Sequence, residues 1–262
     1  MNLFYKTYGA GEALILIPGF ASGAWTWFCQ TEELSRDFRV ITFDPRGIGS
    51  SNNDAKNLSM QTFTKDILRI LDDLKIEKTN VLGASFGGFV AQEFALKFPA
   101  RVENLILACT SAGGKYHIKP DIEILRSFTR NPSLSLSEQI RQFFRPAFTE
   151  EFNAETVEKV CQLREENEVS DETYLAQLGV AISFDFEENL DKIFHRTLVI
   201  TGDKDKIVPM ENSLNLSERI PNARLEIIKN GSHLFFIENA KEFNREVSEF
   251  LSEPSAIADG LM

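Results

Sequence analysis

Cysteine is scarce in this chain of 262 residues, which contains only Cys29, Cys109 and Cys161. An odd number of cysteines without C-x-x-C spacing argues against a disulfide framework and against a zinc site. We expect reduced thiols in a cytoplasmic protein. The first twenty residues also lack the basic start and the cleavage site of a signal peptide, which favours the same compartment.

Basic residues are few as well, because 28 Lys and Arg stand against 39 Asp and Glu, a net charge of −11. Nucleic acids and anionic membrane surfaces attract clustered positive charge, so neither is expected to be a partner. No apolar run approaches the roughly 20 residues that span a bilayer. Apolar residues nevertheless make up 43% of the chain, which is enough for one sizeable core.

Short apolar runs alternate with stretches of helical period along most of the chain. Strands are expected at residues 3–8, 13–19, 39–45, 80–85, 102–111, 197–203 and 223–230, and helices at 59–75, 86–98 and 240–252. Continuous apolar runs are typical of strands that are buried on both faces. The alternation predicts an α/β fold with a mostly parallel, doubly wound sheet and helices on both faces. In such sheets the active site lies beyond the carboxyl ends of the strands.

Residues 114–193 break this alternation, since they contain several helical stretches and no convincing strand. A connection of this length needs a structure of its own. We expect a helical cap, inserted after the sixth strand, that covers the strand ends of a core formed by residues 1–113 and 194–262. The alternative is a pair of extra crossover helices without a functional role. The last ten residues, 253–262, are expected to fray.

The stretch VLGASFGGFVAQEF, residues 81–94, places one serine among three glycines where a strand gives way to a helix. Ser85 is the centre of a G-x-S-x-G pattern formed with Gly83 and Gly87. A strand–turn–helix setting of this kind exposes the serine hydroxyl on a tight turn, and glycines avoid collisions across it. An ordinary serine helix cap would not need glycines on both sides. Ser85 is therefore a candidate nucleophile.

A serine hydroxyl is a weak nucleophile unless a base takes its proton, and the chain offers only three histidines. His117 lies among charged neighbours in the insertion and is interpreted as a surface residue. His195 precedes a strand, at the edge opposite the expected site. His233 lies in a Gly-Ser turn between the last strand and the last helix, where it can reach back to Ser85.

A catalytic histidine needs a carboxylate that holds its tautomer and stabilises the imidazolium. The segment TGDKDKIVP, residues 201–209, follows a buried strand at the same edge and offers Asp203 and Asp205. Either aspartate gives the chain order Ser, Asp, His.

The sequence resembles the α/β-hydrolase superfamily, in its group of small capped serine hydrolases. GASFGG, GDKDKIVP and GSHLFFIEN are similar to the three active-site segments of that family, IPGFASGAW to its oxyanion loop, and FDPRGIGSS to its D-x-R-G-x-G-x-S turn. The resemblance implies that Ser85 is the nucleophile, His233 the base and Asp205 the acid that orients it.

The resemblance also implies an oxyanion hole formed by the backbone N–H groups of Phe20 and Phe86. Pro18 departs from the pattern, because the family usually has histidine at that position. Since the hole uses backbone donors, we expect it to be retained. Asp44 and Arg46 are interpreted as structural residues that brace loops near the site.

A serine nucleophile argues against the dehalogenase and epoxide-hydrolase branches of the family, which use a carboxylate. Hydrolysis of a carboxylic ester of a small molecule is the first interpretation, with no metal and no organic cofactor. The stretch from residue 76 to 114 is similar to 3-oxoadipate enol-lactonases, so a lactonase is the second. C–C bond hydrolases share the scaffold, but PGFASGA does not match their oxyanion loop.

The triad alone is compatible with several further activities. Serine perhydrolases and non-haem haloperoxidases share it. A receptor that binds a ligand without turning it over also fits, because such receptors retain the triad. Monomer and homodimer are both compatible with the sequence.

Charge is unevenly distributed along the insertion. Residues 115–146 contain six basic and three acidic residues, whereas 147–192 contain three basic and thirteen acidic ones. We expect the first half to face the site, with Phe144 lining it and Arg141 or Arg145 reaching an anionic group of the substrate. The alternative is that both arginines are solvated on the outer helix face and pair with acids there. Trp25 and Trp27 are interpreted as packing residues, with pocket lining by one of them as the alternative.

Overall fold

The computed structural model describes residues 3–51 and 57–253, and nearly all of the expected frayed tail lies outside this range. Its centre is a seven-stranded sheet in the order β1-β3-β2-β4-β5-β6-β7. The strands are β1 (Tyr5–Tyr8), β2 (Glu12–Ile17), β3 (Phe38–Phe43), β4 (Thr79–Ala84), β5 (Val102–Ala108), β6 (Arg196–Gly202) and β7 (Ala223–Ile228). Only β1 is antiparallel to its neighbour. The expected doubly wound α/β fold is thereby confirmed.

Alternate residues of the central strands supply two separate hydrophobic cores. Leu14 and Leu16 of β2 pack into one core, and Ile15 and Ile17 into the other. This follows from the two-residue period of a strand that is covered on both faces. Helices α2 (Met60–Asp73), α3 (Phe86–Lys97) and α8 (Glu211–Arg219) cover one face, and α1 (Thr31–Leu34), α9 (Phe235–Glu238) and α10 (Ala240–Ser252) cover the other.

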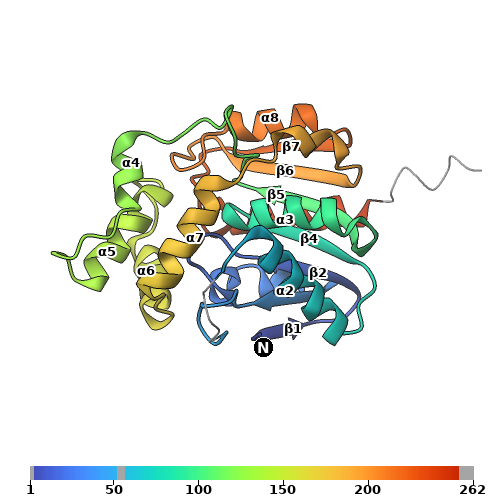
Figure 1. Ribbon diagram of the computed structural model, residues 1–262, viewed down its shortest axis with the longest axis horizontal. Helices are drawn as coiled ribbons and strands as arrows, with labels where there is room; N and C mark the ends of the chain where they lie inside the picture. The colour runs from blue at the N-terminus through green and yellow to red at the C-terminus, as the bar shows by residue number, and fades with distance from the viewer. Residues whose placement is uncertain (1–2, 52–56, 254–262) are drawn as a thin grey trace, which may run out of the picture.

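The long insertion, residues 114–193, lies between β5 and β6 and contains helices α4 (Ile122–Ser127), α5 (Leu136–Phe144), α6 (Ala154–Glu166) and α7 (Asp171–Ser183). Figure 1 shows α4, α5 and α6 beyond one end of the strands, with α7 leading back to the sheet. The insertion follows the fifth strand, not the sixth as expected, because the described part of the chain forms only five strands before it.

The two ends of the insertion are joined to each other at its base. Gly113 forms an isolated antiparallel bridge with Asp185. The Gly114 N–H donates to the Phe184 carbonyl over 3.1 Å, and the Phe186 N–H donates to the Ala112 carbonyl over 2.8 Å. The chain therefore leaves and re-enters the core at one place.

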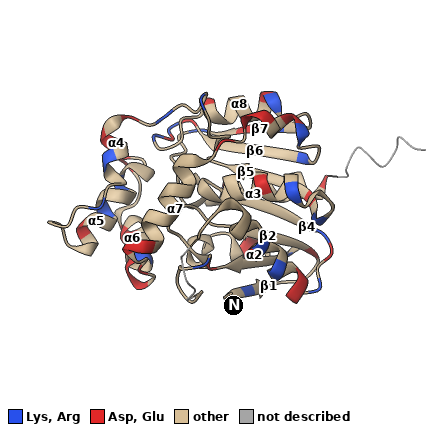
Figure 2. Cartoon of the chain, viewed as in Figure 1, with Lys and Arg blue, Asp and Glu red and all other residues tan. Residues whose placement is uncertain are grey.

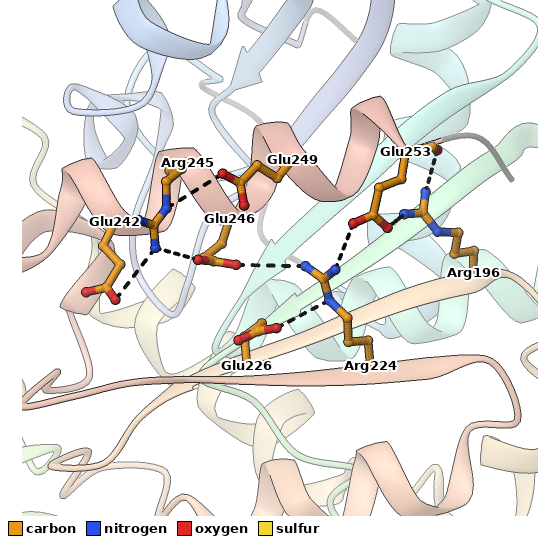
Figure 3. Close-up of polar contacts among 8 residues, drawn as sticks. All are labelled: Arg196, Arg224, Glu226, Glu242, Arg245, Glu246, Glu249 and Glu253. Carbon is orange, nitrogen blue, oxygen red and sulfur yellow. Dashed lines mark hydrogen bonds and ion pairs between the residues drawn. The ribbon is translucent and has the colours of Figure 1, made fainter.

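Charged side chains gather on the periphery of the molecule, whereas the central strand β4 and the part of α7 after Glu172 lack them (Figure 2). The largest cluster ties α10 to β6 and β7 (Figure 3). Arg224 of β7 contacts Glu253 at 3.0 Å and Glu246 at 3.8 Å, and Arg196 contacts Glu253 at 2.5 Å. Each such pair contributes little on its own, but the set covers the edge strand β7 with charge.

Candidate active site

Ser85 occupies the turn between β4 and α3 in a conformation that side chains rarely adopt. Its φ is 55° and its ψ is −120°. The Ser85 N–H donates to the Ala108 carbonyl over 2.9 Å, and the Thr110 hydroxyl donates to the Ser85 carbonyl over 2.8 Å. Backbone strain of this kind persists only where surrounding bonds hold it, and it occurs at functional sites.

The glycines around Ser85 are required by close backbone contacts. A Cβ at Gly83 would lie 2.3 Å from the Gly87 carbonyl oxygen, and a Cβ at Gly87 would lie 2.2 Å from the Ile17 carbonyl oxygen. Both distances are far below van der Waals contact, so a side chain at either position would displace the turn or the neighbouring strand.

His233 and Asp205 lie next to each other at the same edge of the sheet. His233 Nδ1 is 2.8 Å from Asp205 Oδ2. The other carboxylate oxygen of Asp205 accepts the N–H groups of Ile207 and Val208, each over 2.8 Å. Both side chains are buried, whereas Asp203 is exposed. Of the two aspartates left open by the sequence, the structure brings Asp205 to the histidine.

The loop that carries His233 is held by Glu238, a residue that the sequence did not single out. One carboxylate oxygen accepts the N–H of Thr149 over 2.7 Å and its hydroxyl over 2.9 Å. The other accepts the Ser232 N–H over 3.1 Å and also the Ser232 hydroxyl. Glu238 thus connects the histidine loop with the insertion.

The loop of residues 18–24 passes beside Ser85. Within residues 3–51 and 57–253, neither the Phe20 N–H nor the Phe86 N–H donates to a protein acceptor. Asp44 accepts the N–H groups of Ala24 over 2.8 Å and Ser50 over 2.9 Å, which fixes the end of this loop.

Arg46 stabilises the turn of the segment FDPRGIGSS through a bidentate ion pair. Its Nε lies 2.8 Å and its Nη2 2.5 Å from the two carboxylate oxygens of Asp66 on α2. The bracing role expected for Asp44 and Arg46 agrees with these contacts.

Two cavities meet at Ser85. The smaller, about 50 Å³, is apolar and also contacts His233, Trp25, Phe143 and Phe144. The larger is a cleft of about 880 Å³ between the core and the insertion. Its apolar lining consists mainly of Phe20, Phe86, Phe89, Leu125, Phe128, Leu175, Leu178, Ile182, Phe184, Ile207 and Val208.

Polar residues of the cleft come chiefly from the insertion. His117 and Lys119 line it, and burial lowers the pKa of His117 below its usual value. His117 was interpreted from the sequence as a surface residue, but it faces the cleft. His195 directly precedes β6, at the end of the strands opposite to Ser85. Its Nε2 is 3.0 Å from the Pro99 carbonyl oxygen.

Arg141 on α5 and Arg145, which directly follows this helix, lie away from the cleft, contrary to the expectation. Arg141 contacts Glu158 at 2.6 Å and Glu165 at 3.6 Å on α6, and Arg145 is exposed. Neither lines a cavity that contains Ser85. The reason is the rotation of α5, which turns Phe144 inward and Arg141 toward the acidic α6.

The tryptophans differ in their surroundings. Trp25 lines the smaller cavity and packs edge-on against Phe144, with ring centroids 6.4 Å apart. Trp27 is completely buried in the core, with its ring 5.2 Å from that of Phe236. One of the two is therefore a lining residue and the other a packing residue.

No group of three or more His, Cys, Asp or Glu side chains in the described part of the chain could hold a metal ion. No helix among residues 3–51 and 57–253 has the length and apolar character needed to cross a membrane.

The sequence matches the alpha/beta hydrolase fold family over residues 12–126 and 121–240. It is 31% identical to the 2-hydroxy-6-oxononadienedioate/2-hydroxy-6-oxononatrienedioate hydrolase of Burkholderia vietnamiensis, covering 96% of this chain and 91% of that protein. It is also 31% identical to the poly(3-hydroxyalkanoate) depolymerase of Ectopseudomonas oleovorans, covering 92% of this chain and 84% of that protein.

The structure is similar to that of the enol-lactonase from Burkholderia xenovorans, with a TM-score of 0.80 and 25% identity. The similarity covers 96% of each chain. The chain therefore belongs to the alpha/beta hydrolase fold family, and it is a hydrolase.

Proposed function

We propose that this protein is a serine hydrolase that cleaves a carboxylic ester of a small molecule, with Ser85 as nucleophile, His233 as base and Asp205 as the acid that orients it. The observation that carries the proposal is the 2.8 Å contact between His233 Nδ1 and Asp205, on a histidine that lines the same cavity as the strained Ser85. A proton on Nδ1 donates to the carboxylate and leaves Nε2 free to accept.

In the proposed reaction, Ser85 Oγ attacks the acyl carbonyl carbon while His233 Nε2 takes the hydroxyl proton. The tetrahedral intermediate collapses, the C–O bond to the alcohol breaks, and the alcohol leaves with the proton from His233. Water then attacks the acyl-enzyme with His233 again as base, which releases the acid and restores Ser85. The N–H groups of Phe20 and Phe86, which have no protein acceptor among the described residues, would bind the oxyanion.

The insertion acts in this proposal as a cap that shapes the substrate site. The small cavity on the His233 side suits one short apolar group of the ester, and the larger cleft suits the other. The relative from Burkholderia vietnamiensis is named for a dicarboxylate. Arg130 is already bound to Asp171 and to the Val169 carbonyl, so among the described residues Lys119 is the one Lys or Arg of the cleft lining without an ion pair. An uncharged ester fits this lining better than a dicarboxylate.

A lactone is the second candidate substrate, because the chemistry is the same and the fold is shared with an enol-lactonase. In a lactone the alcohol remains tethered to the acyl group, so both would have to fit within the large cleft. The ester is preferred because Ser85 lines two cavities, which offers one for each side of the ester bond.

The test is a panel of p-nitrophenyl esters of increasing acyl length, neutral lactones and a vinylogous diketo acid, assayed with wild type and Ser85→Ala. A fluorophosphonate should label wild type once, at Ser85, and hydrolysis of a short-chain ester should disappear in the variant. Turnover of the diketo acid alone would replace the proposal by C–C hydrolysis. Binding of apolar ligands without any turnover would indicate a receptor.

A further inference from the structure

Both polar groups of the peptide between Phe20 and Ala21 are hydrogen-bonded. The Ala21 N–H donates to Oε1 of Gln177 over 2.9 Å, and the Ser22 hydroxyl donates to the Phe20 carbonyl over 3.2 Å. Ala21 has a φ of 51°, in the left-handed region that disfavours a side chain. This conformation therefore depends on the bonds around it.

Gln177 reaches the loop from a distant part of the chain. It lies on α7 of the insertion, 156 residues from Ala21 in sequence, and only 1% of it is exposed. At this burial its amide oxygen has no access to water, so its hydrogen-bonding capacity is met by the Ala21 N–H.

A second residue on the same face of α7 fixes the neighbouring side chain. Tyr174, one turn before Gln177, packs edge-on against the ring of Phe20 with centroids 4.8 Å apart. The Tyr174 hydroxyl donates to the Phe128 carbonyl over 2.7 Å, and the Arg130 guanidinium lies 4.6 Å from its ring. Helix α7 thus contacts Phe20 through its side chain and through the peptide that follows it.

We propose that Gln177 is a positioning residue for the oxyanion hole: it fixes the Phe20–Ala21 peptide and, through the Phe20 Cα, the preceding Gly19–Phe20 peptide that carries the Phe20 N–H. This inference rests on the proposed function, in which that N–H binds the oxyanion. It makes the insertion part of the catalytic machinery as well as the wall of the cleft. An oxyanion donor acts on the transition state more than on the bound substrate, so its misplacement lowers kcat more than it raises KM.

The decisive variant is Gln177→Met, which keeps the length of the side chain and removes the acceptor oxygen. We expect kcat for a p-nitrophenyl ester to fall about ten- to a hundredfold, with KM within about twofold of wild type. A trifluoromethyl ketone, which adds to Ser85 and forms an oxyanion, should bind more weakly by a similar factor. Gln162→Met, at an exposed position of α6, is the matched control and should behave as wild type.

A readout independent of turnover is hydrogen exchange at the Ala21 amide, measured by NMR. Exchange should be slow in wild type and in Gln177→Glu, whose carboxylate can accept the same bond, and fast in Gln177→Met. If Gln177→Met does not fold, Gln177→Ala is measured in its place.

Unchanged kcat and inhibitor affinity in a folded variant would overturn the proposal. So would a lower kcat accompanied by normal inhibitor affinity and a protected Ala21 amide. If wild type neither reacts at Ser85 nor hydrolyses esters, the proposed function fails instead, and the Ala21 exchange still decides whether Gln177 holds the loop.

Discussion

The core and the insertion contribute to the site by different means. In the core, each site group is fixed by hydrogen bonds in which at least one partner is a backbone group: two N–H groups hold the Asp205 carboxylate, and the Ala108 carbonyl and the Thr110 hydroxyl hold the turn of Ser85. The insertion contributes mostly apolar side chains to the walls of the two cavities. Changes in the insertion can therefore alter the cleft while the core groups keep their positions. The exceptions are the two places where the insertion contacts a loop of the core: the loop of residues 18–24 and the loop that carries His233.

The largest effect should come from the histidine of the core. If His233 is the base, His233→Ala should lower kcat by about 10⁴-fold or more, because the serine can no longer lose its proton. His117→Ala, a change in the insertion, should cost a few-fold at most, and His195→Ala should have no effect. Steady-state kinetics with one ester would measure all three. A ranking with His117 first would mean that the insertion carries the base.

The next effect concerns the carboxylate. Asp205→Asn should lower kcat by two or more orders of magnitude, because an amide does not stabilise the imidazolium and can favour the wrong tautomer. Asp203→Asn, an exposed neighbour in the same loop, is the control and should stay near wild type. Thermal unfolding of both variants checks that the loop remains folded. Equal losses in the two variants would contradict the assignment of Asp205.

A smaller effect is expected on selectivity. Phe143→Ala enlarges the small cavity beside His233, so the preferred acyl length should increase by several carbons while activity on the shortest ester falls. Phe152→Ala removes a partly buried phenylalanine of the insertion that stacks on Phe148 and lines neither cavity. This control should lose stability without a change in chain-length profile. Profiles that shift equally in both variants would mean that the insertion acts only through its stability.

The smallest effect is expected for the arginine that the sequence favoured. Arg141→Ala should leave unchanged the ratio of kcat/KM for a neutral ester and for the same ester with a terminal carboxylate. Its pairs with α6 are exposed to solvent and screened, so the free energy of unfolding should hardly change. Lys119→Ala, at the cleft, is the comparison. A rise of this ratio in Arg141→Ala alone, through lost activity on the carboxylate ester, would place this arginine near the substrate.

The sequence was sufficient for the fold and for the candidate residues of the core. Ser85, Asp205 and His233 each follow a strand of a parallel sheet, and the carboxyl ends of such strands meet at one edge. Local pattern and chain order therefore determine where these residues lie. The same reasoning left Asp203 and Asp205 open, because the turn of one loop decides between them.

The insertion could not be predicted to the same depth. The direction of Arg141 depends on how α5 is rotated against α6, and its partners Glu158 and Glu165 lie a helix away. Gln177 bonds to a residue far upstream, and no short-range pattern marks such a pair. The one available signal was the segment 173–183, which lacks charged residues within an acidic half of the insertion.

The paired ends of the insertion also bear on how this family can change. Because Gly113 and Asp185 are paired, the segment between them leaves and re-enters the core at the same point. A different segment could be joined at those two residues without disturbing the sheet. The new segment would have to supply a hydrogen-bond acceptor for the Ala21 N–H. It would also have to supply two donors for the Glu238 carboxylate. Grafts that match only the volume of the cleft would then produce folded proteins with poor turnover.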